Sequence, residues 1–225
     1  MKRLHAVSCA LLALVTSTVS LAQDRSTQIG FRAGVLEERL QGWFPSLNGG
    51  LSSHDDLVAG LFAIQPISGP VSIEGGLQVA LRGGRCQAGT AEGNVVRQDL
   101  LLRYLEVPLL LRVDLPGHTV KPHVAAGLNL AWLLSAQLEQ TALPASWPPF
   151  RASVTDEMRG FALGAEVGVG AAVRLTKACT FHLDSRYVYG LTELLAGNGL
   201  VAGPWNRRTM RSQDVRVMLG ASYRL

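Results

Sequence analysis

The chain is 225 residues long with a mass of 24.1 kDa, enough for one ordinary domain or one small barrel. Charged residues make up 17% and hydrophobic residues 48% of the chain, which excludes a disordered polyelectrolyte. The formal net charge is +4, and no cluster of Lys and Arg lies beside aromatic residues, so we expect no nucleic-acid partner. The only long apolar run is at the N-terminus, so no internal transmembrane helix is expected.

The first residues have the features of a secretory signal peptide. Lys2 and Arg3 form a positive start, a short apolar core follows, and small residues precede a cleavage site before Gln23. Polar residues within the run argue against an uncleaved membrane anchor, and no Cys follows the site as a lipoprotein would require. The sequence therefore predicts a cleaved signal peptide over 1–22 and one exported domain over 23–225.

The exported part alternates with a period of two residues. In the segment 103–115, every second residue from Leu105 to Leu115 is apolar, while the opposite face includes Glu106 and Arg112. This alternation is typical of β-strands and not of helices. Eight such segments are predicted as strands: 28–38, 56–67, 71–82, 103–115, 120–135, 161–175, 179–192 and 214–225.

The composition of the two faces indicates which one points inward. One face is uniformly bulky and apolar, whereas the other is mostly Gly and Ala with isolated charges. A soluble sandwich would carry many Lys, Thr and Ser residues on its polar face. Small residues beside charges suit a narrow interior, and a bulky apolar face suits lipid, where only a closed sheet pairs all its backbone groups. The sequence therefore predicts an all-β fold, an eight-stranded antiparallel up-and-down transmembrane β-barrel; a soluble periplasmic β-sandwich is the alternative.

Short and long connections alternate along the chain. The short ones are 68–70, 116–119 and 176–178, and the long ones are 39–55, 83–102, 136–158 and 195–210. Short periplasmic turns and longer extracellular loops are typical of outer-membrane barrels, so we expect outer-membrane location with the membrane lipid as a partner. Cys86 and Cys179 then lie on opposite sides of the membrane, too far apart for a disulfide.

Three stretches carry a resemblance to a known family. They are YLEVPLL from Tyr104 to Leu110, the strand opening Lys121-Pro122-His123, and FHLDSRYVYGLT over 181–192. In these features the chain resembles the small outer-membrane β-barrels of Bacteroidetes-type bacteria that are often called PorT-like. The resemblance implies insertion by the barrel-assembly machinery, and one branch of the family is linked to protein secretion. Such barrels usually end in an aromatic residue, whereas this chain ends at Leu225.

Charged residues on the inward face form the main candidate site. They are Arg32, Glu74, Glu106, Arg112, Glu166, Asp184, Arg186 and Arg216. An eight-stranded barrel is narrow enough to be filled by side chains, so we interpret these residues as a structural ion-pair network that plugs the interior. Within it we expect Glu166 to pair with Arg186. The alternative is a polar conduit, which would make the protein a small-solute channel. Pro108 on the same face predicts a bulge or kink, because proline removes a ladder donor.

Sites for catalysis and metal binding are less well supported. His182, Asp184 and Ser185 are close in sequence, but strand parity places Ser185 outside and the other two inside, so no nucleophile–base pair forms. The triplet His54-Asp55-Asp56 at the end of the first loop is more typical of a solvated turn than of a metal site. We therefore expect no enzyme activity, no cofactor and no metal.

Aromatic residues in the long loops are the candidates for recognition. They are Trp43, Phe44, Trp147, Phe150 and Trp205. Aromatic side chains often anchor interfaces, although these could instead pack together as a lid over the barrel. The resulting hypothesis is a non-enzymatic outer-membrane barrel with an envelope-scaffold, partner-binding or secretion-accessory role. Its partner would be an extracellular or secretion-system protein.

Overall fold

The computed structural model describes residues 26–41, 54–89, 95–143, 150–194 and 211–225. These ranges contain the strands β1 (Gln28–Gln41), β2 (His54–Ser68), β3 (Val71–Gly89), β4 (Val95–Asp114), β5 (Val120–Leu143), β6 (Phe150–Ser153), β7 (Phe161–Arg174), β8 (Cys179–Gly190) and β9 (Arg211–Arg224), with a 3₁₀ turn, η1 (Thr155–Glu157). No helix among them is long and apolar enough to cross a membrane. The predicted signal peptide over 1–22 lies outside the described residues.

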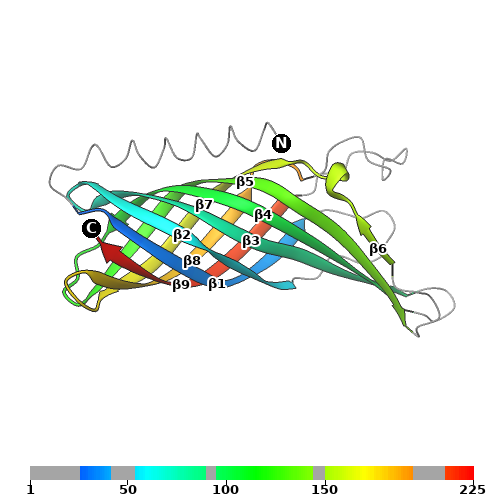
Figure 1. Cartoon of the computed structure of the whole chain (residues 1–225), viewed down its shortest axis with the longest axis horizontal. Helices are drawn as coiled ribbons and strands as arrows, with labels where there is room; N and C mark the ends of the chain where they lie inside the picture. The colour runs from blue at the N-terminus through cyan, green and yellow to red at the C-terminus, as the bar shows by residue number, and fades with distance from the viewer. Residues whose placement is uncertain (1–25, 42–53, 90–94, 144–149, 195–210) are drawn as a thin grey trace.

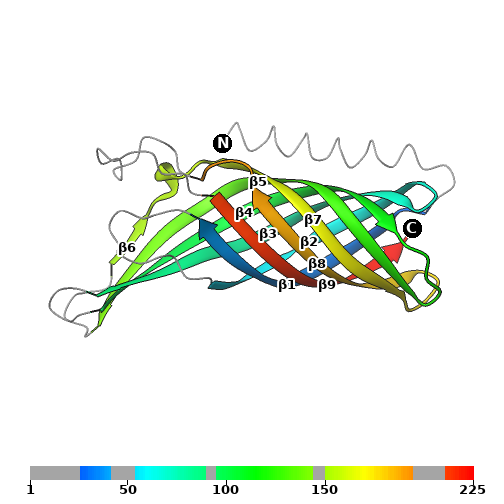
Figure 2. The same ribbon diagram turned by 180° about the vertical axis from the view of Figure 1, so that it is seen from behind.

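Eight of the strands form one closed antiparallel barrel. Each strand from β1 to β5 and from β7 to β9 pairs with its neighbours along the chain, and β9 pairs with β1 over the full length of both strands. Figures 1 and 2 show the strands running obliquely around both sides of the barrel. The predicted eight-stranded up-and-down barrel is confirmed. The sandwich alternative is wrong, because a single sheet closes on itself.

The barrel is apolar outside and polar inside. Phe31, Leu61 and Val169 are 54%, 59% and 60% exposed on the outer face, whereas Arg32 is 2% exposed on the inner face. Phe31 and Arg32 are neighbours in sequence and reach opposite faces because side chains alternate along a strand. A water-soluble protein has the reverse arrangement. The inward assignment made from the composition of the faces is therefore correct.

The outer apolar band has the height of a bilayer core. On β9 and the residue after it, exposed apolar side chains run from Val215 to Leu225, a stretch of about 33 Å at about 3.3 Å per residue. A strand tilt of about 40° reduces this to about 25 Å along the barrel axis, which matches the lipid-facing band of membrane barrels. The band is thus wide enough to span the hydrocarbon layer.

The two ends of the barrel differ. At one end, called here the turn end, β2–β3, β4–β5 and β7–β8 are joined by the short connections 69–70, 115–119 and 175–178. The C-terminus lies at this end (Figure 1), where the Leu225 amide donates a hydrogen bond to the Thr27 carbonyl over 2.9 Å. The three predicted short turns are therefore confirmed. The opposite end is called the loop end.

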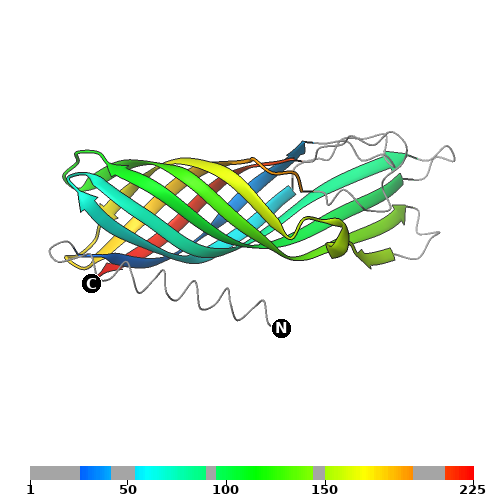
Figure 3. The ribbon, with the colours of Figure 1, turned by 90° about the horizontal axis from the view of Figure 1, so that it is seen from above.

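Strands β3, β4 and β5 project beyond the others at the loop end, as Figure 3 shows from above. The predicted long loop over 83–102 is wrong, because β3 continues to Gly89 and β4 begins at Val95. The predicted loop over 136–158 is also partly wrong, since β5 continues to Leu143 and β6 pairs with its extension. The alternation of apolar and polar residues is lost in these extensions, because both faces of a strand outside the lipid can be in contact with water.

Pro108 lies on the inward face, as predicted, but without the predicted bulge. The pairing offset between β3 and β4 is the same on both sides of Pro108, and only the pairs of Val107 and Pro108 are missing from the ladder. The residue opposite is Gly76, where a Cβ atom would lie 3.4 Å from Cγ of Pro108 and 3.2 Å from Nη2 of Arg32. The proline ring is therefore accommodated by a glycine, and the strand does not need an extra residue.

A register shift does occur four positions earlier in β4. The pairing of β4 with β5 shifts between Arg103 and Tyr104, where Leu134 of β5 is the extra residue. Before this bulge Ala131 is buried, and after it Ala136 is buried, so the inward face changes from odd to even numbers. The bulge thereby keeps small apolar residues facing inward where β5 leaves the barrel proper.

Candidate functional site: the charged barrel interior

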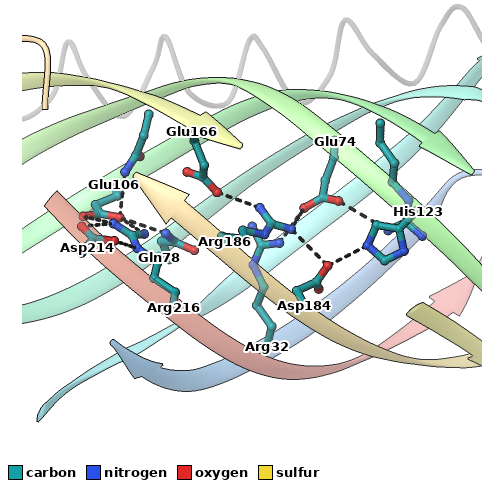
Figure 4. A network of polar contacts seen from close by, with 12 residues as sticks. Arg32, Glu74, Gln78, Glu106, His123, Glu166, Asp184, Arg186, Asp214 and Arg216 are labelled. Carbon is teal, nitrogen blue, oxygen red and sulfur yellow. Dashed lines mark hydrogen bonds and ion pairs between the residues drawn. The ribbon is translucent and has the colours of Figure 1, made fainter. Parts of the chain in front are cut away.

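The structure brings the eight predicted charged residues together inside the barrel. Six of the eight barrel strands, omitting β2 and β5, contribute them, and none is more than 5% exposed. Figure 4 shows two groups of contacts along the barrel interior, one around Glu106 and one around Glu74. We call them the Glu106 cluster, nearer the loop end, and the Glu74 cluster, nearer the turn end.

Glu74 of β3 is the centre of its cluster because three arginines reach its carboxylate. Nη1 of Arg32 and Nη2 of Arg186 donate to Oε1 over 2.5 and 2.6 Å. Nη1 of Arg112 lies 3.5 Å from Oε2. The three arginines come from β1, β8 and β4, so one carboxylate joins strands across the interior.

Arg186 extends the Glu74 cluster toward two further acids. Its Nη1 donates to Oε1 of Glu166 over 2.9 Å, the pair expected from the sequence, and its Nη2 lies 3.7 Å from Oδ1 of Asp184. Nε2 of His123 lies 2.7 Å from the same Asp184 oxygen. A Cβ atom at Gly170 would lie 2.5 Å from this imidazole nitrogen, so only glycine leaves room for the ring.

Glu106 of β4 is held by two arginines and two amides. Arg82 donates to Oε1, and Nη1 of Arg216 donates to Oε2 over 2.6 Å. The side-chain amides of Gln78 and Asn129 donate to Oε2 over 2.9 and 3.1 Å. Both oxygens of this buried carboxylate therefore accept hydrogen bonds from charged or amide donors, which lowers the cost of burying its charge.

Asp214 completes the Glu106 cluster. It forms a bidentate pair with Arg216, whose Nε and Nη2 donate over 2.5 and 3.0 Å, and it lies 3.2 Å from Arg82. Glu38 lies 3.8 Å from Arg82 on the loop-end side. Acidic and basic side chains thus alternate along the interior. Removing one partner of a buried ion pair typically lowers the free energy of unfolding by about 3–5 kcal/mol.

Several members of the network were not among the predicted site residues. They are Glu38, Gln78, His123, Asn129 and Asp214. Strand parity places each of them on the inward face, and Asp214 is two residues before Arg216 on the same strand. Parity could therefore have found them, whereas their partners depend on the pairing of distant strands.

An apolar layer covers the interior at the loop end. Tyr104 and Leu102 of β4 pack with Met158, beside η1, and with Leu194, which follows β8. The Arg159 amide donates to the Leu194 carbonyl over 2.8 Å, which joins the segments before β7 and after β8. The guanidinium of Arg82 lies 5.3 Å from the Tyr104 ring centre, so the layer rests directly on the Glu106 cluster.

The histidine considered for catalysis has a different partner. Ser185 is on the outer face, as parity predicted, whereas Nε2 of His182 lies 2.8 Å from Oγ of Ser222. The Ser222 hydroxyl donates to Oε1 of Gln28 over 3.0 Å, so it accepts from His182 and the imidazole is not placed to act as its base. Asp184 contacts His123 instead of His182.

The remaining predicted sites are only partly described. Phe150 opens β6 and is 57% exposed, while Trp43, Phe44, Trp147 and Trp205 lie outside the described residues. The triplet 54–56 pairs with β1 as the start of β2, so its prediction as a turn is wrong. Over the described ranges, no group of three or more His, Cys, Asp or Glu side chains could hold a metal ion. Cys179 is free at the turn end, and Cys86 lies in the loop-end part of β3.

Comparison with known proteins gives similar folds at low identity. No protein-family model matches the sequence, and no curated protein is significantly similar to it. Among solved structures, the attachment invasion locus protein Ail of Yersinia pestis is 12% identical, with 90% of this chain and 100% of that chain covered and a TM-score of 0.44. The outer membrane protein OprG from Pseudomonas aeruginosa is 13% identical, with 89% and 97% covered and a TM-score of 0.46.

A third similar structure is an enzyme. The outer membrane protease OmpT from Escherichia coli is 9% identical, with 89% of this chain and 97% of that chain covered and a TM-score of 0.44. At these identities and TM-scores the similarities carry no conclusion about activity or partner. Membership of the PorT-like family stays a prediction.

Proposed function

We propose that this protein is an integral outer-membrane barrel that performs no catalysis and presents its loop end to a partner protein. The observation that carries this proposal is the inverted polarity of the closed sheet. An apolar band about 25 Å high surrounds an interior of paired charges, and such a surface is stable only when lipid covers it. An N-terminal signal peptide over 1–22 would supply the export that this location requires.

Membrane fractionation tests the location. We expect the protein in the outer-membrane fraction, and we expect its mobility on a detergent gel to change when the sample is boiled, because a closed barrel resists detergent unfolding. Recovery in the soluble periplasmic fraction with no change on boiling would contradict the proposal. Mass spectrometry of the same sample tests cleavage before Gln23.

The sealed interior supports a scaffold over a small-solute channel. Arginines and carboxylates fill both clusters, and the apolar layer of Met158 and Leu194 closes the loop end. We therefore expect no stepwise conductance in planar lipid bilayers from protein whose folding has been checked by its gel shift. Reproducible conductance steps from that sample would favour the channel.

The loop-end extension supports the partner-binding role. Phe150 is 57% exposed on β6, beside the Arg151–Glu139 ion pair, so this strand offers an aromatic side chain outside the lipid-facing band. A photo-crosslinking residue in place of Phe150 is expected to capture a protein in living cells. The same residue in place of Leu61, which is in the lipid-facing band, is the control and should capture only lipid. Equal results at both positions would contradict a partner at the loop end.

The resemblance of the Tyr104–Leu110 run to PorT-like barrels supports a secretion-accessory role as one form of this function. Insertion by the barrel-assembly machinery would then proceed with Leu225 as the terminal residue. Export of secreted proteins in a deletion strain tests the role, and unchanged secretion would leave the general scaffold function in place.

A further inference from the structure

A polar cavity opens at the turn end of the barrel, on the opposite side from the proposed partner surface. Its volume is about 320 Å³. It is lined by residues at the turn ends of all eight barrel strands and by residues of the β2–β3 and β4–β5 turns. This size is at the lower end of cavities that hold small molecules.

The lining of this cavity is strongly basic. Among the described residues of the lining, Arg112, Lys121, Arg174 and Arg224 contribute four cationic side chains and Asp114 the one carboxylate. Asp114 is already occupied, because Nε of Arg112 donates to it over 2.8 Å. Within the described ranges, Lys121, Arg174 and Arg224 form no side-chain ion pair. The cavity therefore gathers positive charges that these residues do not neutralise.

This arrangement differs from the rest of the interior. In the Glu74 cluster directly above, three arginines face the carboxylates of Glu74, Glu166 and Asp184. A structural network of paired charges does not explain the excess of cationic side chains around the cavity, because like charges that lie close together repel each other. A bound anion would remove that repulsion.

His182 supplies a second polar group in the lining. It is 1% exposed, and its Nδ1 has no hydrogen-bond partner. Since the Ser222 hydroxyl donates to Gln28, Nε2 of the neutral His182 imidazole donates to Ser222, and Nδ1 is buried in the wall of the cavity.

We propose that the turn-end cavity binds a small phosphate-bearing anion. Arg174, Lys121 and Arg224 would contact its charged oxygens near the mouth, while Arg112 would contact it deeper inside. The cavity is larger than one phosphate group, so the ligand class is a phosphorylated small molecule or a phosphate headgroup. The proposed function bears on this site only through its location, since the turn end of an outer-membrane barrel faces the periplasm and the ligand would then be periplasmic.

Calorimetric titration of the folded barrel in a non-ionic, phosphate-free detergent tests the site, with pyrophosphate and glucose 6-phosphate as probes. We expect both probes to bind, and we expect Lys121→Ala with Arg174→Ala to weaken binding by about tenfold or more, because hydrogen bonds to charged groups are among the strong ones. Lys177→Ala is the matched control, since Lys177 is exposed in the neighbouring turn and does not line the cavity. Its affinity should remain within about twofold of the original.

Two results would overturn the site: no binding of either probe, or an equal loss of affinity in the Lys177→Ala control. The second result would mean that the general charge of the turn end attracts the probes. These results are independent of fractionation, so failure of the site and failure of the outer-membrane proposal can be told apart.

Lipid discs separate the two sources of phosphate. The titration is repeated in discs of phosphatidylcholine alone and in discs that also contain phosphatidylglycerol. One outcome is that the original chain binds pyrophosphate more weakly in the discs with phosphatidylglycerol than in those without it. If the variant with both Lys121→Ala and Arg174→Ala then shows no such difference, the site is assigned to a lipid headgroup. Equal binding in both discs and in the phosphate-free detergent would assign it to a soluble phosphorylated molecule, because phosphatidylcholine also carries a phosphate.

Discussion

Replacing Arg186 by alanine tests the charged interior most directly. The arginine is 2% exposed and donates to Glu74 over 2.6 Å and to Glu166 over 2.9 Å, with Asp184 3.7 Å away. After the change Glu74 keeps Arg32 and Arg112, but Glu166 loses the one ion pair found for it in the described part of the chain. A buried carboxylate without its partner is the expected source of instability.

The magnitude follows from these contacts. Two hydrogen bonds between charged groups contribute about 1.5–3 kcal/mol each, and breaking a buried pair costs about 3–5 kcal/mol. We therefore expect the free energy of unfolding to fall by about 4 kcal/mol. With a urea dependence of about 2–3 kcal/mol per molar, the unfolding midpoint should fall by roughly 1.5 M.

The assay is urea unfolding of the barrel in lipid vesicles, followed by the gel shift between folded and unfolded protein. Arg151→Ala is the control, because Arg151 also forms an ion pair, with Glu139 over 2.5 Å, but its side chain is 68% exposed. Exposed pairs contribute about 0–1 kcal/mol, so this midpoint should change little. Equal midpoints for Arg186→Ala and the original chain would refute the view that the network stabilises the barrel.

Two further predictions concern packing and thiols. Gly170→Ala should lower the free energy of unfolding by about 1–3 kcal/mol, because the new Cβ atom would lie 2.5 Å from Nε2 of His123. Gly160→Ala is its control, with no atom within 4 Å of the added Cβ, and the same urea assay checks both; equal loss in the two variants would contradict the packing argument. Reduction should leave the mass of the intact monomer unchanged, because Cys86 and Cys179 lie toward opposite ends of the barrel. A gain of two hydrogen atoms, seen as about 2 Da in mass spectrometry, would contradict the topology.

The sequence determines the barrel wherever one face of a strand meets lipid. Between Leu105 and Leu115 the lipid-facing positions are all apolar, and the inward positions hold charges, so alternation reveals both the strand and its orientation. The same reasoning orients β9, where Val215 and Val217 are exposed while Asp214 and Arg216 are buried. Short turns, two of which contain Gly and Pro, then indicate the order of neighbouring strands.

The extension of β3 to β5 was missed for the converse reason. Around Arg85 and Asp99, neither face of the paired strands carries a continuous apolar row, although the two side chains form an ion pair over 2.7 Å. Where both faces meet water, the period of two residues disappears from the sequence. Likewise, the predicted bulge at Pro108 ignored Gly76, which lies on the neighbouring strand and leaves space for the proline ring.

Tertiary structure alone decides which charges meet. Strand parity places Glu74, Arg32 and Arg186 inside, but their contacts join β3 with β1 and β8 across sequence separations of 42 and 112 residues. The basic cavity at the turn end has the same origin, because Lys121, Arg174 and Arg224 come together only when the sheet closes. The alternation of residue types along a strand shows which side chains face lipid and which face the interior. Which side chains then meet across the interior depends on how the sheet closes and on the register of its strands, and no local sequence pattern contains that information.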